Sequence, residues 1–256
     1  MSRLNAVVLS GITVAVLTTS GAAFTAINRD DIPPAVAEPR TGRPEEAILS
    51  PATEPPTADV SGARRLEADA LKGAGLRVPG GWEIVRVREE RHDDRDVTVI
   101  RHQPDSYRLG GPHTSLVLDA DGTILGFTRL EDGSDGPLPT ARRAEEIALR
   151  FLRQVAPGHA EGLSVNWVAQ HAETVTRPDG ATETIAGIKV KMRHDNGLYT
   201  WVVVGPDETV LTYERDITWD SGRGRRGTQM WLHDSWIAAH EGTGPQPDSP
   251  YALATS

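Results

Sequence analysis

The chain contains no cysteine among its 256 residues. Disulfide bonds, cysteine nucleophiles, cysteine-based zinc sites and lipid attachment to cysteine are therefore excluded. Aromatic residues make up only 5% of the chain, yet six of them are Trp, and three Trp fall between residues 219 and 236. Basic residues are also scarce, with 27 Lys and Arg against 36 Asp and Glu. The net charge of −9 argues against nucleic acid as a partner of the whole chain, because phosphate contacts need a basic surface.

Charge is nearly absent from the N-terminal segment, where Arg3 is the only charged side chain before Arg29. A basic start, an apolar core over residues 6–17 and small residues after it are typical of a secretory signal peptide. The same stretch is long enough for an uncleaved membrane anchor, with residues 4–27 in the bilayer. Residues 1–27 are thus predicted to be a signal peptide or a transmembrane anchor. Both alternatives place the rest of the chain outside the cytoplasm, either secreted or anchored to the cytoplasmic membrane.

The segment that follows has the composition of a spacer. Residues 28–60 contain seven Pro and no aromatic side chain. Such a sequence cannot bury enough apolar surface to offset its conformational entropy, so a disordered linker is predicted. The last residues, 241–256, are expected to form a flexible tail. The folded part is predicted to comprise a first unit at 61–131 and a second at 140–240, the latter with a Trp-rich C-terminal segment.

Two matches within the chain indicate an internal repeat. Residues 63–71 and 141–149 are identical at six of nine positions, at an offset of 78. Residues 113–129 align with 199–215 at an offset of 86, with identical Thr, Val, Asp, Thr, Leu and Arg. Because both matches occur in the same order, a duplication is predicted, with an insertion of about eight residues in the second unit.

Each unit has the pattern of a helix followed by antiparallel strands. The second helix is expected to begin after the N-cap Thr140, to end at Pro157–Gly158, and to bury one apolar face. That face comprises Ala144, Ile147, Ala148, Phe151, Leu152 and Val155. Alternation over residues 188–193 predicts a strand that buries Ile188, Val190 and Met192 and turns Lys189, Lys191 and Arg193 to water. Turns at 195–197 and 205–208 separate the strands that follow. The predicted fold class is therefore α+β, built from two tandem helix-plus-antiparallel-sheet units.

This pattern resembles the PepSY-type domain, a cystatin-like module, over residues 62–219 as a tandem pair. The resemblance rests on the Ala-Arg-Arg-Ala-Glu-Glu-Ile-Ala-Leu-Arg-Phe-Leu helix at 141–152, the Tyr-Thr-Trp-Val-Val-Val strand at 199–204 and the hairpin after it. It implies an extracytoplasmic or membrane-tethered bacterial protein that binds and restrains a peptidase or senses conditions at the envelope. It implies no catalytic residue.

No motif in the chain indicates catalysis. The His-Glu-x-x-His spacing of helical zinc sites and the Gly-x-Ser-x-Gly nucleophile elbow are both absent. His92, Asp93, Asp94, His102 and Asp105 could meet across a hairpin as metal ligands, but a solvated strand end explains them more simply. We therefore predict no catalytic residue, no metal site and no cofactor.

The segment after residue 218 is the strongest candidate for a binding site. Three Arg stand in a Gly-rich stretch, Arg223, Arg225 and Arg226, and they are expected to form an exposed anion-binding loop. Trp219 and Trp231 flank this loop and would add rigid contact area for a partner. The alternative is that the Trp side chains pack on the sheet as part of a closing strand and short helix.

The function predicted from these features is a non-enzymatic, extracytoplasmic binding module at the bacterial cell envelope. Its partner would be an envelope protein or peptide, including a peptidase that it restrains. If the N-terminal segment is not cleaved, residues 4–27 would also contact the membrane. One alternative is a sensor domain for a small ligand or envelope stress. A second alternative is a hydrolase whose site has no recognisable motif.

Overall fold

The computed structural model describes residues 59–131, 136–177 and 179–254. The predicted signal or anchor at 1–27 and nearly all of the linker at 28–60 lie outside the described residues. The helices are α1 (Val60–Ala74), α2 (Ala141–Val155), α3 (Pro157–Ala160) and α4 (Asp234–His240), with a short 3-10 turn, η2 (Pro206–Glu208). The strands are β1 (Glu83–His92), β2 (Arg95–Gln103), β3 (His113–Asp119), β4 (Ile124–Leu130), β5 (Leu163–Thr176), β6 (Thr182–His194), β7 (Tyr199–Val204), β8 (Val210–Ile217), β9 (Trp219–Asp220) and β10 (Arg225–Arg226).

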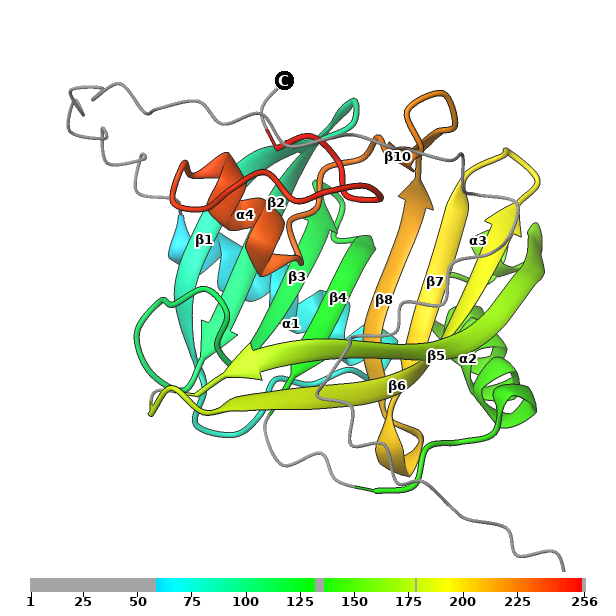
Figure 1. Ribbon diagram of the computed structural model, residues 1–256, viewed down its shortest axis with the longest axis horizontal. Coiled ribbons are helices and arrows are strands. Elements are labelled where there is room, and N and C mark those ends of the chain that lie inside the picture. The colour runs from blue at the N-terminus through cyan, green and yellow to red at the C-terminus, as the bar shows by residue number, and fades with distance from the viewer. Residues whose placement is uncertain (1–58, 132–135, 178, 255–256) are drawn as a thin grey trace, which may run out of the picture.

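Eight of the strands form one antiparallel sheet, which confirms the predicted α+β class with antiparallel pairing. The strand order is β1-β2-β3-β4-β8-β7-β6-β5 (Figure 1). Along the chain, α1 precedes the four strands β1 to β4, and α2 and α3 precede β5 to β8. The last strand of each set, β4 and β8, pair with each other at the centre of the sheet. The sheet is therefore continuous across both halves of the chain.

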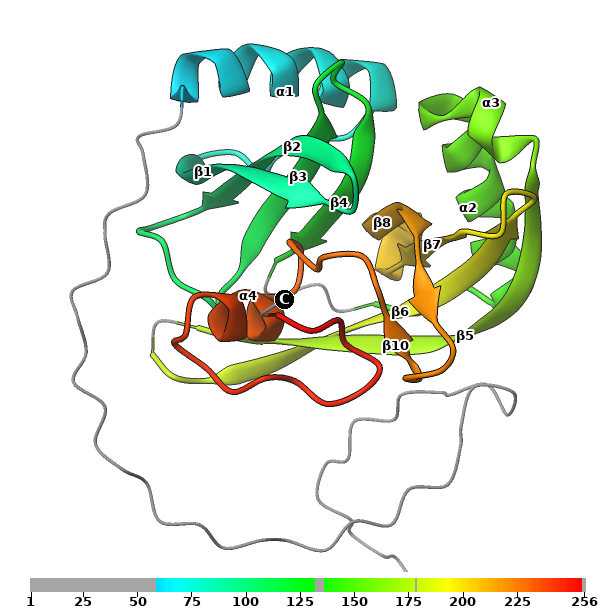
Figure 2. The same ribbon diagram turned by 90° about the horizontal axis from the view of Figure 1, so that it is seen from above.

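Helices α1 and α2 cover one face of this sheet (Figure 2). As predicted, the Thr140 hydroxyl caps α2, accepting a hydrogen bond from the Arg143 amide at 3.2 Å. Helix α1 begins at Val60, because the Asp59 carboxylate accepts hydrogen bonds from the free amides of its first turn. The apolar face predicted for α2 is buried against the sheet, except that Val155 is only partly buried. Its partners on the strands include Ile100, Leu116, Phe127, Val190, Val202 and Tyr213.

The C-terminal segment covers the opposite face over strands β2 to β4 (Figure 1). Its apolar side chains pack on Val97, Val99, Val117 and Leu125 of the sheet. The expectation of a flexible tail at 241–256 is wrong for its described part. Ala252 and Ala254 are buried, and the Ala254 amide donates to the Gln246 side chain at 2.8 Å. These small apolar side chains pack in one cluster with Trp231 and Trp236. Composition alone does not reveal this packing.

Strands β5 and β6 form a long arm that crosses the same face beyond the C-terminal segment (Figure 1). Its far end packs Val175 and Ile185 against Leu130, Val203 and Leu211. The crossing requires a glycine in β6, because a Cβ on Gly187 would lie 2.6 Å from Cγ1 of Val203. This folded-back arm shelters the central part of the face from solvent.

A chain cut between its two halves should stay together, because β4 pairs with β8 and both helices share one core. We expect a protease site inserted at residue 133 to be cleaved without separating the fragments. Size-exclusion chromatography of the cleaved protein under native conditions should give one peak at the mass of the intact chain. Separation of the fragments would show instead that the halves are independent domains.

The buried histidines predict that stability falls in mild acid. Burial lowers the pKa of His92 to about 4, helped by Arg226, and neither ring nitrogen has a hydrogen-bond partner in the described structure. Burial and then Arg215 likewise lower the pKa of His159 to about 4. The unfolded chain binds protons at these sites near pH 6.5, whereas the folded chain does so only near pH 4. Acidification through this window therefore favours unfolding.

We expect His92 alone to reduce the free energy of unfolding by about 3 kcal/mol when the pH falls from neutral to 4. Urea unfolding at a series of pH values measures this loss. The variant His92→Gln cannot take up the proton, so its unfolding free energy should depend less steeply on pH than that of the wild type. Equal slopes for the two proteins would contradict the assignment to His92.

Candidate functional site

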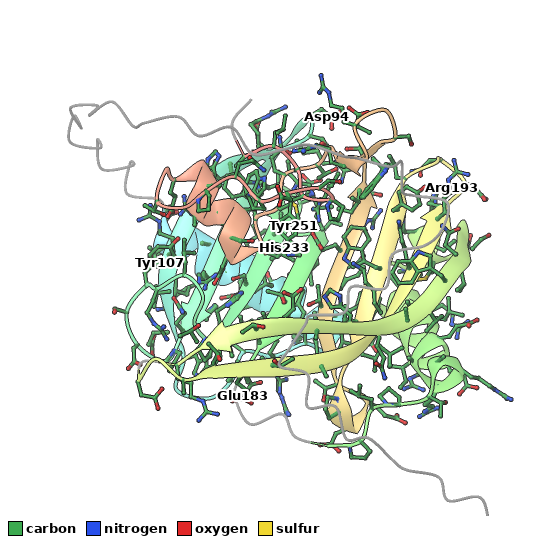
Figure 3. All side chains as sticks on the ribbon, viewed as in Figure 1. Asp94, Tyr107, Glu183, Arg193, His233 and Tyr251 are labelled. Carbon is green, nitrogen blue, oxygen red and sulfur yellow. The ribbon has the colours of Figure 1, made fainter. Side chains whose placement is uncertain are left out.

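The Arg-rich stretch forms a small hairpin rather than an open loop. Strands β9 and β10 pair with Arg225 opposite Asp220 and Arg226 opposite Trp219. Gly224 makes the turn between them with a positive φ of 63°, a conformation that favours glycine. The hairpin extends from the end of β8 and lies at the same edge as the β1–β2 turn, where Figure 3 marks Asp94. The expectation of a loop is therefore wrong for Arg225 and Arg226, which lie in β10.

A pocket of about 340 Å³ lies between this hairpin, the end of β1 and the C-terminal segment. Four of the five predicted site residues line it: Arg223, Arg225, Arg226 and Trp231. Glu90, Arg91, Asp220, Trp236, His240, Leu253 and Ala254 are among the other lining residues. We call this cavity the Arg–Trp pocket. Trp219 is the one predicted residue that does not line it.

Arg226 does not lie on the surface, so the expectation that all three Arg are exposed is wrong. Its side chain is buried, and its Nη1 donates to Oε1 of Glu214 at 2.6 Å. The other guanidinium nitrogens donate to the carbonyl oxygens of Thr228 and Gln229, both at 2.9 Å. All of this hydrogen bonding is internal. Arg226 therefore forms part of the pocket wall as a structural residue.

Glu214 is the acceptor around which this wall is built. Besides Arg226, it accepts from Nε1 of Trp201 at 2.9 Å, and Nε2 of His233 lies 3.2 Å from its Oε2. Burial alone would raise the pKa of Glu214, but the charges of Arg226 and His233 outweigh it and hold the pKa far below its usual range. The carboxylate is thus ionised at all ordinary pH. Figure 3 shows His233 beside Tyr251 on this face of the molecule.

The remaining Arg side chains give the pocket its positive charge. Arg223 is exposed and lies 3.6 Å from Asp220, while Arg91 pairs with Asp96 at 2.7 Å across an exposed surface. Arg225 is half-buried and has no acidic partner within the described residues. Its Nη1 is buried without a hydrogen-bond acceptor there. Arg225 is therefore the group best placed to bind an anion that enters the pocket.

The opposite wall of the pocket is aromatic and rigid. Trp231 meets Trp236 edge-on with ring centroids 4.8 Å apart, and His240 stacks on Trp236 at 5.2 Å. Nε1 of Trp231 donates to the Arg91 carbonyl oxygen at 2.8 Å, and Nδ1 of His240 donates to the Ala254 carbonyl oxygen at 2.8 Å. Since Trp231 and Trp236 are almost fully buried, they shape the cavity, and they expose little contact area of their own.

Trp219 belongs to a second aromatic group on the β6–β7 side. Nζ of Lys191 lies 5.2 Å from the Trp219 ring centroid and 4.4 Å from that of Tyr199. Nζ of Lys189 lies 4.2 Å above the Trp201 ring, and burial lowers the pKa of Lys189 to about 8. The prediction that Lys189 and Lys191 face water is wrong, because aromatic rings lie against their ammonium groups.

The candidate metal ligands at the β1–β2 hairpin do not come together. His92 is buried, and Asp93 accepts a hydrogen bond from Thr228 at 2.7 Å. His102 lies on the helix side, where its Nε2 is 2.6 Å from the Glu67 carboxylate. Within the described residues, no group of three or more His, Asp or Glu side chains is arranged to hold a metal ion.

The two kinds of Arg in the pocket should respond differently to substitution. We expect Arg226→Ala to lower the free energy of unfolding by about 3–5 kcal/mol, because it leaves the Glu214 carboxylate buried and unpaired. Arg223→Ala should change it by at most about 1 kcal/mol, since that side chain is exposed. Thermal and urea unfolding of the two variants measure the difference. Equal stability of both variants would show that the buried pair has no structural role.

Comparison with known proteins gives no relative from which a function could be carried over. No protein-family model matches the chain, and no curated protein or solved structure matches it either. Among the helices of the described residues, none is both long and apolar enough to cross a membrane. Inference about function therefore starts from the Arg–Trp pocket and the charges around it.

Proposed function

We propose that this protein is a non-enzymatic, extracytoplasmic binding module that holds an acidic segment of an envelope protein or peptide in the Arg–Trp pocket. The observation that carries the proposal is Arg225, a cation with no acidic partner in the described structure, beside a rigid aromatic wall. A guanidinium matches a carboxylate in shape and binds it through two parallel hydrogen bonds. Arg223 also lines the pocket and adds an exposed positive charge.

The distribution of charge on the chain favours an acidic partner at the pocket. The chain as a whole carries a net charge of −9, so its surface repels acidic proteins at most orientations. The pocket rim bears Arg91, Arg223 and Arg225 and therefore offers such a partner one favourable point of approach. The size of the cavity, about 340 Å³, suits one or two side chains of a peptide better than a whole folded surface.

The lining residues favour binding over catalysis. His240, the histidine of the pocket, is fixed by its hydrogen bond to the Ala254 carbonyl oxygen. The two acids, Glu90 and Asp220, lie 3.6 Å from the guanidinium groups of Arg88 and Arg223, respectively. No described lining residue pairs a nucleophile with a base. A rigid cationic cavity of this kind can position a ligand, and we assign it no reaction.

The proposed location rests on the N-terminal sequence. Residues 1–27 would export the chain and then be cleaved or remain as an anchor. Residues 28–60 would hold the folded part away from the membrane. A peptidase at the envelope is the partner that the resemblance to PepSY-type domains suggests.

The two halves of the fold support the proposed tandem PepSY-like arrangement. Each half consists of one long helix followed by four antiparallel strands in the same order. At the centre of the sheet Phe127 pairs with Tyr213, and these two residues correspond to each other at the repeat offset of 86. Equivalent residues that meet face to face are what a two-fold relation between two copies produces. A duplication thus accounts for both the sequence matches and the pairing.

The proposal is tested by reversing the charge at the pocket. The wild-type chain and the variant Arg225→Glu are immobilised and exposed to an envelope extract, and the retained protein is identified and then titrated against each. We expect the variant to bind at least about tenfold more weakly, since a hydrogen bond to a charged group contributes about 1.5–3 kcal/mol. Added salt should weaken wild-type binding more than it weakens binding of the variant.

Arg153→Glu is the matched control, because it makes the same charge change on the exposed side of α2, far from the pocket. It should leave the affinity within about twofold of the wild type. If Arg153→Glu and Arg225→Glu weaken binding equally, the effect is due to overall charge and the pocket is not the site.

A further inference from the structure

A second cavity lies on the helix side of the sheet, opposite the Arg–Trp pocket. It measures about 310 Å³ and lies between the end of α1, the C-terminal half of α2 and the start of β8. Gly75 and Gln154 both line it and lie close together, since a Cβ on Gly75 would come within 2.8 Å of the Gln154 side chain. Figure 2 shows the two helices side by side over the sheet. We call this cavity the interhelix groove.

The groove has an apolar floor and a basic rim. Phe127, Ile147 and Phe151 form the floor together with Leu76 and Val210. The rim carries Arg77, Arg129 and Arg150, against Glu208 as the one acid among the described lining residues.

Two of the three Arg side chains on the rim lie near an acid, and the third, Arg77, does not. Glu208 binds Arg143 through two hydrogen bonds of 2.5 and 2.6 Å and lies 4.0 Å from Arg150. Arg129 pairs with Glu131. Arg77 is exposed and has no acidic partner in the described part of the chain. An occupant of the groove should therefore combine negative charge with aliphatic side chains.

The chain itself contains such a segment shortly before α1. Residues 45–49 read Glu-Glu-Ala-Ile-Leu, two acids followed by an aliphatic run. Within 28–58 this is the only place where two large aliphatic residues stand together, and acids directly precede them. The segment thus matches both the rim and the floor of the groove in charge and polarity.

The length of the connection permits docking. Residues 50–58 join the segment to Asp59 at the start of α1, and nine extended residues span about 30 Å. The groove lies at the other end of α1, whose 15 residues measure about 22 Å. A tether of this length also gives the segment an effective concentration in the millimolar range, which a separate partner must exceed to displace it.

We propose that residues 45–49 of this chain bind in the interhelix groove, with Glu45 and Glu46 toward Arg77 and with Ile48 and Leu49 over the aromatic floor. Docking would fold the spacer back along α1 and shorten the distance between the folded part and the N-terminal segment. The inference is independent of the partner proposed for the Arg–Trp pocket, which lies on the other face.

The absence of cysteine makes disulfide trapping a direct test. The full chain with Leu49→Cys and Gln154→Cys is oxidised, and the cross-link is followed by mass spectrometry of the digest. The control carries Leu49→Cys and Asp121→Cys. Asp121 is exposed beside Gly122, whose Cβ would meet Leu66 in the middle of α1, so it lies nearer than Gln154 to the start of the helix.

If the tether moved freely, the cysteine at position 49 would form a disulfide with the cysteine at position 121 at least as fast as with the one at position 154. Docking reverses this order, and we expect the Gln154 pair to form about tenfold faster than the Asp121 pair. Adding Ile48→Ser or Arg77→Glu should remove that advantage, and combining Arg77→Glu with Glu45→Arg and Glu46→Arg should restore part of it. Equal rates for the two pairs, or rates that Ile48→Ser does not change, would overturn the proposal.

Discussion

The buried ion pair between Glu214 and Arg226 is the interaction on which the rest of this structure depends. Glu214 lies on β8, the strand that joins the two halves of the sheet, and Arg226 lies on β10 at the start of the C-terminal segment. The same guanidinium binds the carbonyl oxygens of Thr228 and Gln229, which fixes the direction of the chain toward Trp231. The pair thus anchors the layer that covers β2 to β4, and with it the wall of the Arg–Trp pocket.

This arrangement divides three neighbouring Arg between two roles. The buried pair neutralises Arg226, and removing one partner would leave the other charge buried and unpaired. Arg223 is exposed beside Asp220 and contributes little to stability, whereas the half-buried Arg225 has no acidic partner among the described residues. The cost of burying Glu214 is offset by three donors, from Arg226, Trp201 and His233. The hairpin is therefore both the attachment of the C-terminal layer and the carrier of the pocket's charge.

Local patterns in the sequence predicted helix α2, its cap at Thr140 and the antiparallel strands from β6 to β8, because each depends on residues close together in the chain. The clustering of Arg and Trp in the sequence also pointed to four residues of the pocket, Arg223, Arg225, Arg226 and Trp231, but not to Arg91 or Trp236. What local patterns could not reveal is which Arg is buried, since that depends on Glu214 meeting Arg226 through the fold. The packed tail and the covered Lys189 were missed for the same reason: segments distant in sequence shield them.

Strand β8 contributes Val210 to the interhelix groove and supports the Arg–Trp pocket from behind through Glu214. Its Tyr213 packs edge-on against Phe151 in the floor of the interhelix groove, with ring centroids 5.3 Å apart, and its next residue, Glu214, holds Arg226 behind the Arg–Trp pocket. Successive strand residues point to opposite faces, so occupants of the two cavities cannot collide. Any influence of one on the other would have to shift β8, which β4 and β7 hold from both sides. We therefore expect occupation of one cavity to leave the other unchanged.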